Sequence, residues 1–192
     1  MKTFVMGAAA TLLAAPLALA QSGDIYIEGA AGYAFEGDYG YNGLDFTVEG
    51  DWSGGVALGI TDLIGDFDVE LDIYSTSRGY EGYSTSLDSL SVMVNGLYDF
   101  DMGDSPITPY VGLGIGQVKV EYDGANQFPA FSDEEWVFGW QAMAGGRWQA
   151  NEQFSLFAEW RYQSAEDADL AGLPVEYGSH NLLLGGRLTF GQ

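Results

Sequence analysis

Eight stretches of this chain alternate apolar and polar residues, and the clearest of them covers residues 67–74. Apolar side chains occupy every odd position there, and acidic side chains occupy the even positions as far as Asp72. Because successive side chains of a strand point to opposite faces, such a segment has one apolar and one charged face. The pattern predicts an all-β chain whose strands lie at about 25–35, 53–61, 67–78, 87–100, 107–122, 135–149, 154–166 and 179–190.

The predicted connections alternate in length along the chain. Those after the first, third, fifth and seventh strands are the longer ones, at 36–52, 79–86, 123–134 and 167–178. The intervening ones are short, at 62–66, 101–106 and 150–153. Short turns at one end and longer loops at the other are typical of bacterial outer-membrane barrels. Residues 21–192 are therefore predicted to form one domain, an eight-stranded antiparallel up-and-down transmembrane β-barrel.

The first twenty residues are predicted to be a signal peptide. Lys2 is followed by an apolar run that ends in Ala18-Leu19-Ala20, a small-x-small cleavage pattern. The alternative is an uncleaved anchor, but the run is short for a spanning helix, which needs about 20 residues, and it contains Pro16. The chain has no cysteine, so an exported fold would rely on burial and backbone pairing rather than on disulfides.

The alternation fits two barrels, which differ in the face that looks outward. A soluble lipocalin-like barrel hides its apolar face, and a membrane barrel turns it to lipid. Three features favour the membrane: glycines among the charges on the polar face, basic residues almost confined to that face, and aromatic residues near the strand ends. These aromatic residues, the predicted interfacial girdle, are Tyr98, Trp136, Trp148, Trp160 and Phe190.

The charged face predicts a network of ion pairs inside the barrel. An eight-stranded interior is only wide enough for side chains to fill, and buried charges must be paired. Residues at related depth on four neighbouring strands are expected to alternate in sign in the order Arg147, Glu159, Arg187 and Glu28. The alternative reading is a proton- or ion-conducting pathway. The predicted luminal network comprises Glu28, Asp68, Glu70, Asp72, Lys119, Arg147, Glu159, Arg161 and Arg187.

In the fifth predicted strand the apolar residues occupy odd positions as far as Ile115 and even positions beyond Gly116. One extra residue, a β-bulge near Gly116-Gln117, would return the following apolar residues to lipid and turn Lys119 inward. The alternative is that the strand has already left the bilayer at that point.

The chain has one histidine, His180, next to Ser179 at the start of the last predicted strand. Outer-membrane lipid hydrolases and acyltransferases use a histidine and a serine at that rim, and a nucleophilic serine must lie within hydrogen-bond reach of its base. Adjacent residues of a strand point to opposite faces, so this pair fits such a site poorly. We therefore expect no catalytic site and no cofactor, and the protein is not predicted to be an enzyme.

The longer connections are acidic. Their carboxylates predict an acidic rim exposed to solvent. The alternative is a calcium site, because Ca²⁺ prefers clustered oxygen ligands, and its only candidates are the weak ones Glu166, Asp167 and Asp169. The net charge of −22 excludes nucleic acid as a partner, because phosphate binding needs a basic patch. The acidic residues in and next to the long connections include Glu36, Asp38, Asp45, Glu49, Asp51, Asp133, Glu134, Glu135, Glu166, Asp167, Asp169 and Glu176.

Two segments carry a resemblance to a known family. Residues 108–116, Thr-Pro-Tyr-Val-Gly-Leu-Gly-Ile-Gly, and 181–190, Asn-Leu-Leu-Leu-Gly-Gly-Arg-Leu-Thr-Phe, resemble the fifth and closing strands of the small OmpA-like and opacity-protein outer-membrane barrels. The resemblance implies a monomer in the cell outer membrane, assembled by the barrel-assembly machinery in contact with membrane lipid. Members of the family serve as adhesins, surface antigens, haem-binding proteins or small pores, so membership alone does not assign a function.

These observations lead to one functional hypothesis and two alternatives. The hypothesis is a structural or surface-interaction role, like that of an adhesin or antigen, in which the acidic loops contact an extracellular ligand. The alternatives are a small ion-conducting pore and a lipid-modifying enzyme.

The leader gives a first testable prediction. Amino-terminal sequencing of the protein from an outer-membrane fraction should begin at Gln21, because only Ala18-Leu19-Ala20 combines small residues with a preceding apolar run. A chain that begins before residue 15 would show that the segment is retained.

Overall fold

The computed structural model describes residues 23–35, 37–41, 44–48, 50–79, 85–124, 131–170 and 173–191. The predicted leader lies outside them. Among the described residues, none forms a helix long and apolar enough to cross a membrane. The strands are β1 (Ile25–Ala34), β2 (Gly37–Tyr41), β3 (Leu44–Val48), β4 (Asp51–Ile64), β5 (Phe67–Gly79), β6 (Thr85–Asp99), β7 (Ile107–Gly124), β8 (Phe131–Gln149), β9 (Phe154–Leu170) and β10 (Leu173–Phe190).

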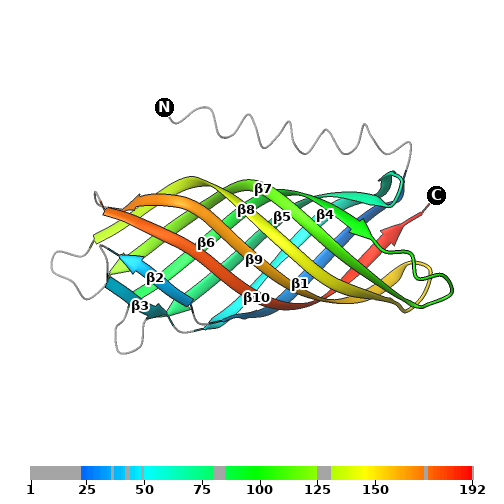
Figure 1. Cartoon of the computed structure of the whole chain (residues 1–192), viewed down its shortest axis with the longest axis horizontal. Helices are drawn as coiled ribbons and strands as arrows, with labels where there is room; N and C mark the ends of the chain where they lie inside the picture. The colour runs from blue at the N-terminus through cyan, green and yellow to red at the C-terminus, as the bar shows by residue number, and fades with distance from the viewer. Residues whose placement is uncertain are drawn as a thin grey trace.

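Eight of these strands form a closed barrel (Figure 1). They pair antiparallel in the order β1-β4-β5-β6-β7-β8-β9-β10, and β10 pairs back onto β1. The closing ladder runs from Ile25 opposite Phe190 to Ala34 opposite Asn181. The predicted eight-stranded, antiparallel up-and-down barrel is confirmed.

A short hairpin, β2–β3, lies within the first long connection, where no strand is predicted. It extends the sheet beyond the outer part of β10, through the pairing of Tyr41 with Val175. The sequence carried a signal for it, because Asn42-Gly43 joins the two strands and Asn-Gly is the typical loop of a two-residue hairpin.

The later strands are longer than predicted at the end with the longer connections. The pairing of β7 with β8 continues to Gly124 opposite Phe131, and that of β9 with β10 continues to Leu170 opposite Leu173. Backbone pairing therefore continues beyond the apolar band, where polar side chains replace apolar ones and the period-two signal of hydrophobicity fades.

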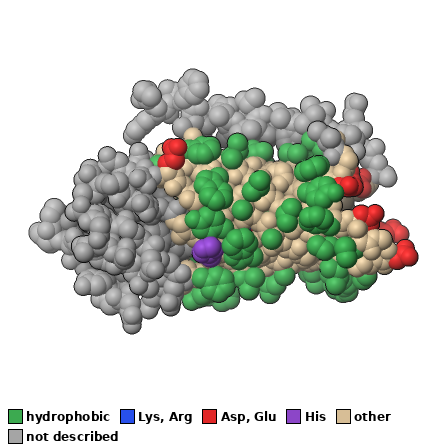
Figure 2. All heavy atoms as spheres, in the orientation of Figure 1, with side chains coloured by type: hydrophobic (Ala, Val, Ile, Leu, Met, Phe, Trp, Pro, Cys, Tyr) green, Lys and Arg blue, Asp and Glu red, His purple; other side chains and the backbone are tan. Residues whose placement is uncertain are grey.

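Apolar side chains cover the outside of the wall (Figure 2). Leu113 and Leu184 are 69% and 68% exposed, whereas their inward-facing neighbours Leu183, Asn181 and Arg187 are buried. A soluble protein has the reverse arrangement. Four of the expected girdle residues are exposed on this outer face, and Tyr98 is half-buried against Phe67 and Phe100.

The predicted bulge in the fifth barrel strand is wrong. The ladder between β6 and β7 runs without interruption through Gly116 and Gln117, opposite Met93 and Val92. Lys119 consequently lies beside Leu90 and Trp136, which are exposed on the outer face, and does not belong to the luminal network. The parity change has a packing cause, because the side chain of Val118 is fully buried over Gly139.

The orientation of the two faces gives a second prediction. Leu184→Arg should destabilise the barrel in lipid vesicles, reducing its free energy of unfolding by about 2–4 kcal/mol, the cost of an arginine on the lipid face near mid-bilayer. Leu183→Gln, one residue away in the polar lumen, should cost less. Denaturant titrations followed by tryptophan fluorescence provide the comparison, and greater sensitivity at Leu183 would contradict the outward apolar face.

Candidate functional site

The lumen is organised by three buried arginines on successive strands: Arg147 on β8, Arg161 on β9 and Arg187 on β10. Each contacts at least one carboxylate, and each guanidinium lies over a tyrosine ring. Because an isolated buried charge costs several kcal/mol, every one of these groups needs such partners.

Arg187 links three strands across the lumen. Its Nε donates to the Glu28 carboxylate of β1, and its Nη1 donates to Asp68 of β5 at 2.8 Å. The guanidinium lies 3.5 Å from the centroid of the Tyr26 ring. Asp68 also accepts a hydrogen bond from the backbone N–H of Asp62, at 3.1 Å. This cluster ties the closing strands to the opposite wall.

Arg161 forms the second cluster. Its Nη1 donates to Asp72 of β5 at 2.5 Å, and its Nε donates to Glu159 of its own strand at 2.9 Å. The other oxygen of Glu159 accepts from the Tyr110 hydroxyl at 2.9 Å, and the Tyr74 ring lies 4.8 Å from the guanidinium. All five residues are buried.

Arg147 forms the third cluster, nearest the short turns. Its Nη1 donates to Asp99 at 2.6 Å, and its guanidinium lies over Tyr110. The sequence predicted an alternation of signs in which Arg147 and Arg187 flank Glu159. The structure forms the Arg187–Glu28 contact, but Glu159 pairs with Arg161, because residues two apart on a strand share a face.

Glu70 has a different environment from the other luminal carboxylates. It accepts hydrogen bonds from the Tyr26 hydroxyl at 3.2 Å and from Asn95 Nδ2 at 2.9 Å. In the part of the chain that the structure describes, Glu70 forms no ion pair with an arginine. The network therefore contains three guanidinium groups and six carboxylates, five of which pair with an arginine while Glu70 is held by neutral donors.

A chain of neutral side chains extends from Asn95 across the lumen, and the sequence analysis missed it. Gln141 Nε2 donates to Asn95 Oδ1 at 2.7 Å, and Gln163 Nε2 donates to Gln141 Oε1 at 3.2 Å and to Ser91 Oγ at 3.0 Å. The alternation in the sequence already places these side chains on the luminal face, but the predicted network contained only charged residues and no amides. The amides hold β6, β8 and β9 at a fixed separation.

Each tyrosine that stacks on an arginine lies against a glycine of an adjacent strand. A Cβ on Gly59 would come within 2.1 Å of the Tyr26 ring, and one on Gly145 within 2.6 Å of the Tyr110 ring. The glycines on the charged face thus provide the room that the tyrosine rings occupy. Even alanine there would displace a ring or a strand.

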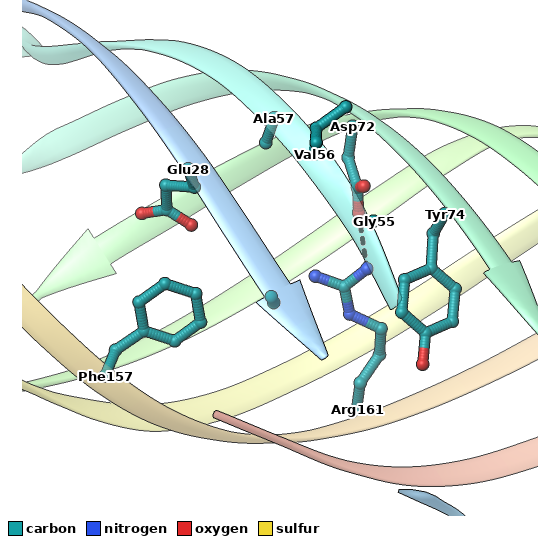
Figure 3. A pocket seen from close by; sticks show the side chains of 9 residues that line it. Glu28, Gly55, Val56, Ala57, Asp72, Tyr74, Phe157 and Arg161 are labelled. Atoms are coloured by element: carbon teal, nitrogen blue, oxygen red, sulfur yellow. Dashed lines mark hydrogen bonds and ion pairs between the residues drawn. The ribbon is translucent and has the colours of Figure 1, made fainter. Parts of the chain in front are cut away.

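One small cavity lies among the described luminal side chains. It has a volume of about 10 Å³ and lies between Glu28 and the Asp72–Arg161 pair, with Tyr74 and Phe157 in its wall (Figure 3). The small residues Ala30, Gly55 and Ala57 complete its lining. Such a volume holds about one water molecule. The cavity gives no passage for a hydrated ion through these side chains as they lie.

The rim residues do not assemble into a catalytic pair. His180 is exposed on the outer face and stacks on Trp160, with ring centroids 5.7 Å apart. Ser179 is buried on the luminal face, where its Oγ accepts a hydrogen bond from Asn181. The two side chains point in opposite directions, so the imidazole cannot activate this serine.

Of the metal candidates, Glu166 is exposed, and the side chains of Asp167 and Asp169 lie outside the described residues. Within the described part of the chain, no three His, Cys, Asp or Glu side chains gather as metal ligands would.

Comparison with known proteins gives one family match and one group of curated relatives. The model of the family described as "Outer membrane protein beta-barrel domain" matches residues 6–187. The chain is similar to outer membrane protein Omp38 of Acinetobacter baumannii, with 33% identity over 202 aligned positions. That match covers 94% of this chain and 55% of Omp38, so the chain spans about half the length of this relative.

Solved structures share the fold at lower identity. Neisserial surface protein A has a TM-score of 0.66 at 20% identity, covering 86% of this chain and 97% of its own. OprG of Pseudomonas aeruginosa has a TM-score of 0.59 at 16% identity, covering 89% and 97%. Ail of Yersinia pestis, solved with the heparin analogue sucrose octasulfate, has 0.50 at 17% identity, covering 86% and 99%.

The Arg187 cluster gives a third prediction. Arg187→Met should destabilise the barrel by about 3–5 kcal/mol, because it leaves two buried carboxylates without their shared cation. Adding Glu28→Gln and Asp68→Asn to the same chain should recover much of the loss. Folding midpoints in lipid vesicles measure both effects.

Arg147→Met is the matched control for that experiment. The side chain of its partner Asp99 is 25% exposed, so water can solvate the carboxylate that remains, and the loss should be smaller. Equal losses for the two variants, or a triple variant no more stable than Arg187→Met alone, would contradict the assigned contacts.

Proposed function

This chain belongs to the outer-membrane protein β-barrel family and lies in the cell outer membrane, and we propose that it acts there in surface interaction. In this proposal the barrel is a filled anchor, and its acidic outer end contacts a cationic partner. The protein works without catalysis or a cofactor, as a monomer inserted by the barrel-assembly machinery.

The observation that carries the proposal is the filled lumen. The three arginine clusters occupy the interior at successive depths, and the chain of amides crosses between them. What remains between Glu28 and Arg161 has room for about one water molecule. This interior supports an anchoring role over ion conduction.

The charge of the outer end supports a cationic partner. In outer-membrane barrels the longer loops face the outside of the cell and the short turns face the periplasm. Residues 36–51 and 165–177 contain only acidic charges, with no lysine or arginine. Such a surface raises the local concentration of cations and repels polyanions.

One relative provides a useful contrast. Ail is an attachment invasion locus protein that was crystallised with a sulfated heparin analogue, and sulfate groups need cationic partners. The outer segments of this chain, residues 36–51 and 165–177, are acidic and would repel sulfate groups. We therefore propose that this chain attaches through its outer end to a basic rather than a sulfated partner.

The test uses cells that display the chain and a surface coated with poly-L-lysine. A variant that neutralises Glu166, Asp167, Asp169 and Glu176 as glutamine or asparagine should lose most of the retention of wild-type cells at low salt. The loss follows from the weakened attraction between the acidic outer end and the cationic surface. The difference in retention between wild type and variant should diminish as salt screens this attraction.

The matched control neutralises four acidic residues of the short turns: Asp66, Asp101, Asp104 and Glu152. It changes the net charge equally but at the periplasmic end, so retention should stay at the wild-type level. Equal loss in both variants would reject a role for the outer segments. Steady single-channel currents from the pure protein in planar bilayers would favour the pore instead.

A further inference from the structure

Among the described residues, the barrel wall is not fully paired at its outer end. The ladder between β1 and β4 ends at Ala34 opposite Asp51, while β5 to β10 continue further. The last three residues of β5, Ser77–Gly79, pair with β6 but have no partner on the β4 side among the described residues. In the described part of the chain, β5 therefore has an unpaired edge at these residues.

The hairpin β2–β3 provides a second unpaired edge among the described residues. β2 pairs with β10, and β3 pairs with β2 and with no further strand in the described part of the chain. The sheet consequently ends at β3 (Figure 1). The edge of such a strand presents backbone N–H and C=O groups that can pair with another chain.

The pairing register identifies which groups of β3 face this edge. Tyr41 pairs with Leu44 across a two-residue connection, and such flanking residues form a hydrogen-bonded pair, after which bonded and non-bonded pairs alternate. Leu44, Phe46 and Val48 therefore bond to β2. The backbone groups of Asp45 and Thr47 point to the free edge.

The hairpin lacks the lysine, proline or bulge that most often blocks an exposed edge, and its acidic charge attracts basic segments and repels acidic ones. Exposed edges are commonly blocked by lysine, proline or a bulge. Residues 37–48 contain no lysine and no proline, and the β2–β3 register is continuous. The segment 36–51 carries five acidic residues and no basic ones, which favours a basic partner.

We propose that β3 is a docking edge for an extended, basic segment of a partner protein, which adds to the hairpin as a further strand. Main-chain hydrogen bonds with Asp45 and Thr47 would supply affinity, and the acidic charge would supply selectivity, as in other cases of strand addition. This inference rests on the proposed surface role and names the chemical class of the partner.

The probe is a short peptide of alternating lysine and valine, titrated against the full chain in lipid nanodiscs. The peptide should bind and slow hydrogen exchange at the amides of Asp45 and Thr47. The same peptide N-methylated at every residue keeps its charge but loses the donors along both edges. It should bind at least about fivefold more weakly, the effect of losing a backbone hydrogen bond.

Thr47→Pro removes one donor from the free edge of β3 and leaves the hydrogen bonds to β2 in place. It should weaken peptide binding by a similar factor, while Thr47→Val, which keeps the N–H, should bind as the wild type does. The circular dichroism of each variant verifies that the barrel is intact. Equal binding of both peptides, or no difference between the two variants, would overturn strand addition.

Two further outcomes are distinguishable. If Thr47→Pro abolishes a concentration-dependent dimer seen by light scattering and the peptide does not compete, the occupant is a second copy and the proposal is wrong. Loss of peptide binding with normal retention on poly-L-lysine would reject the docking edge but leave the surface role intact. Peptide binding without charge-dependent retention would reject the role of the outer acidic segments instead.

Discussion

The ladder between β1 and β10 is the interaction on which the rest of the structure depends. A hydrocarbon layer offers no hydrogen-bond partner to a backbone amide, so a sheet can cross it only if it has no free edge. The pairs from Ile25–Phe190 to Ala34–Asn181 remove that edge. Once the sheet closes on itself, one face of every strand must look to lipid and the other to a narrow interior. The period-two pattern of the sequence follows from this requirement.

The narrow interior then determines how charge is handled. Each arginine neutralises carboxylates from other strands and also covers a tyrosine ring, and each ring needs a glycine opposite it, as Tyr26 needs Gly59. Arginine suits this place because its planar group can stack and donate several hydrogen bonds at once. Arginine, tyrosine and glycine residues of neighbouring strands thus pack together in the described interior, where the cavity beside Arg161 has a volume of about 10 Å³.

The sequence was sufficient to predict the eight barrel strands and, for most of them, which face is apolar, because side-chain parity is a local property of a strand. It could not predict contacts across the lumen, such as Arg187 with Asp68 or Arg147 with Asp99, because these depend on strand tilt and relative depth. Lys119 was misplaced because the parity rule assumed that every apolar residue seeks lipid, whereas Val118 fills the lumen. The hairpin was overlooked although Asn42-Gly43 marked it.

Closure is required only where lipid surrounds the wall. Beyond the bilayer, water can satisfy unpaired backbone groups, so the edges of β3 and of Ser77–Gly79 cost little there. The same edges within the hydrocarbon would each leave several kcal/mol of unsatisfied donors and acceptors, by the same argument. A barrel of this kind can therefore keep a pairing surface only beyond the bilayer, and in the described part of this chain the free edges of β3 and of Ser77–Gly79 both lie at the outer end. The boundary of the membrane thus separates the closed wall, in which every strand must be paired, from a region where a partner strand can add to the sheet as proposed.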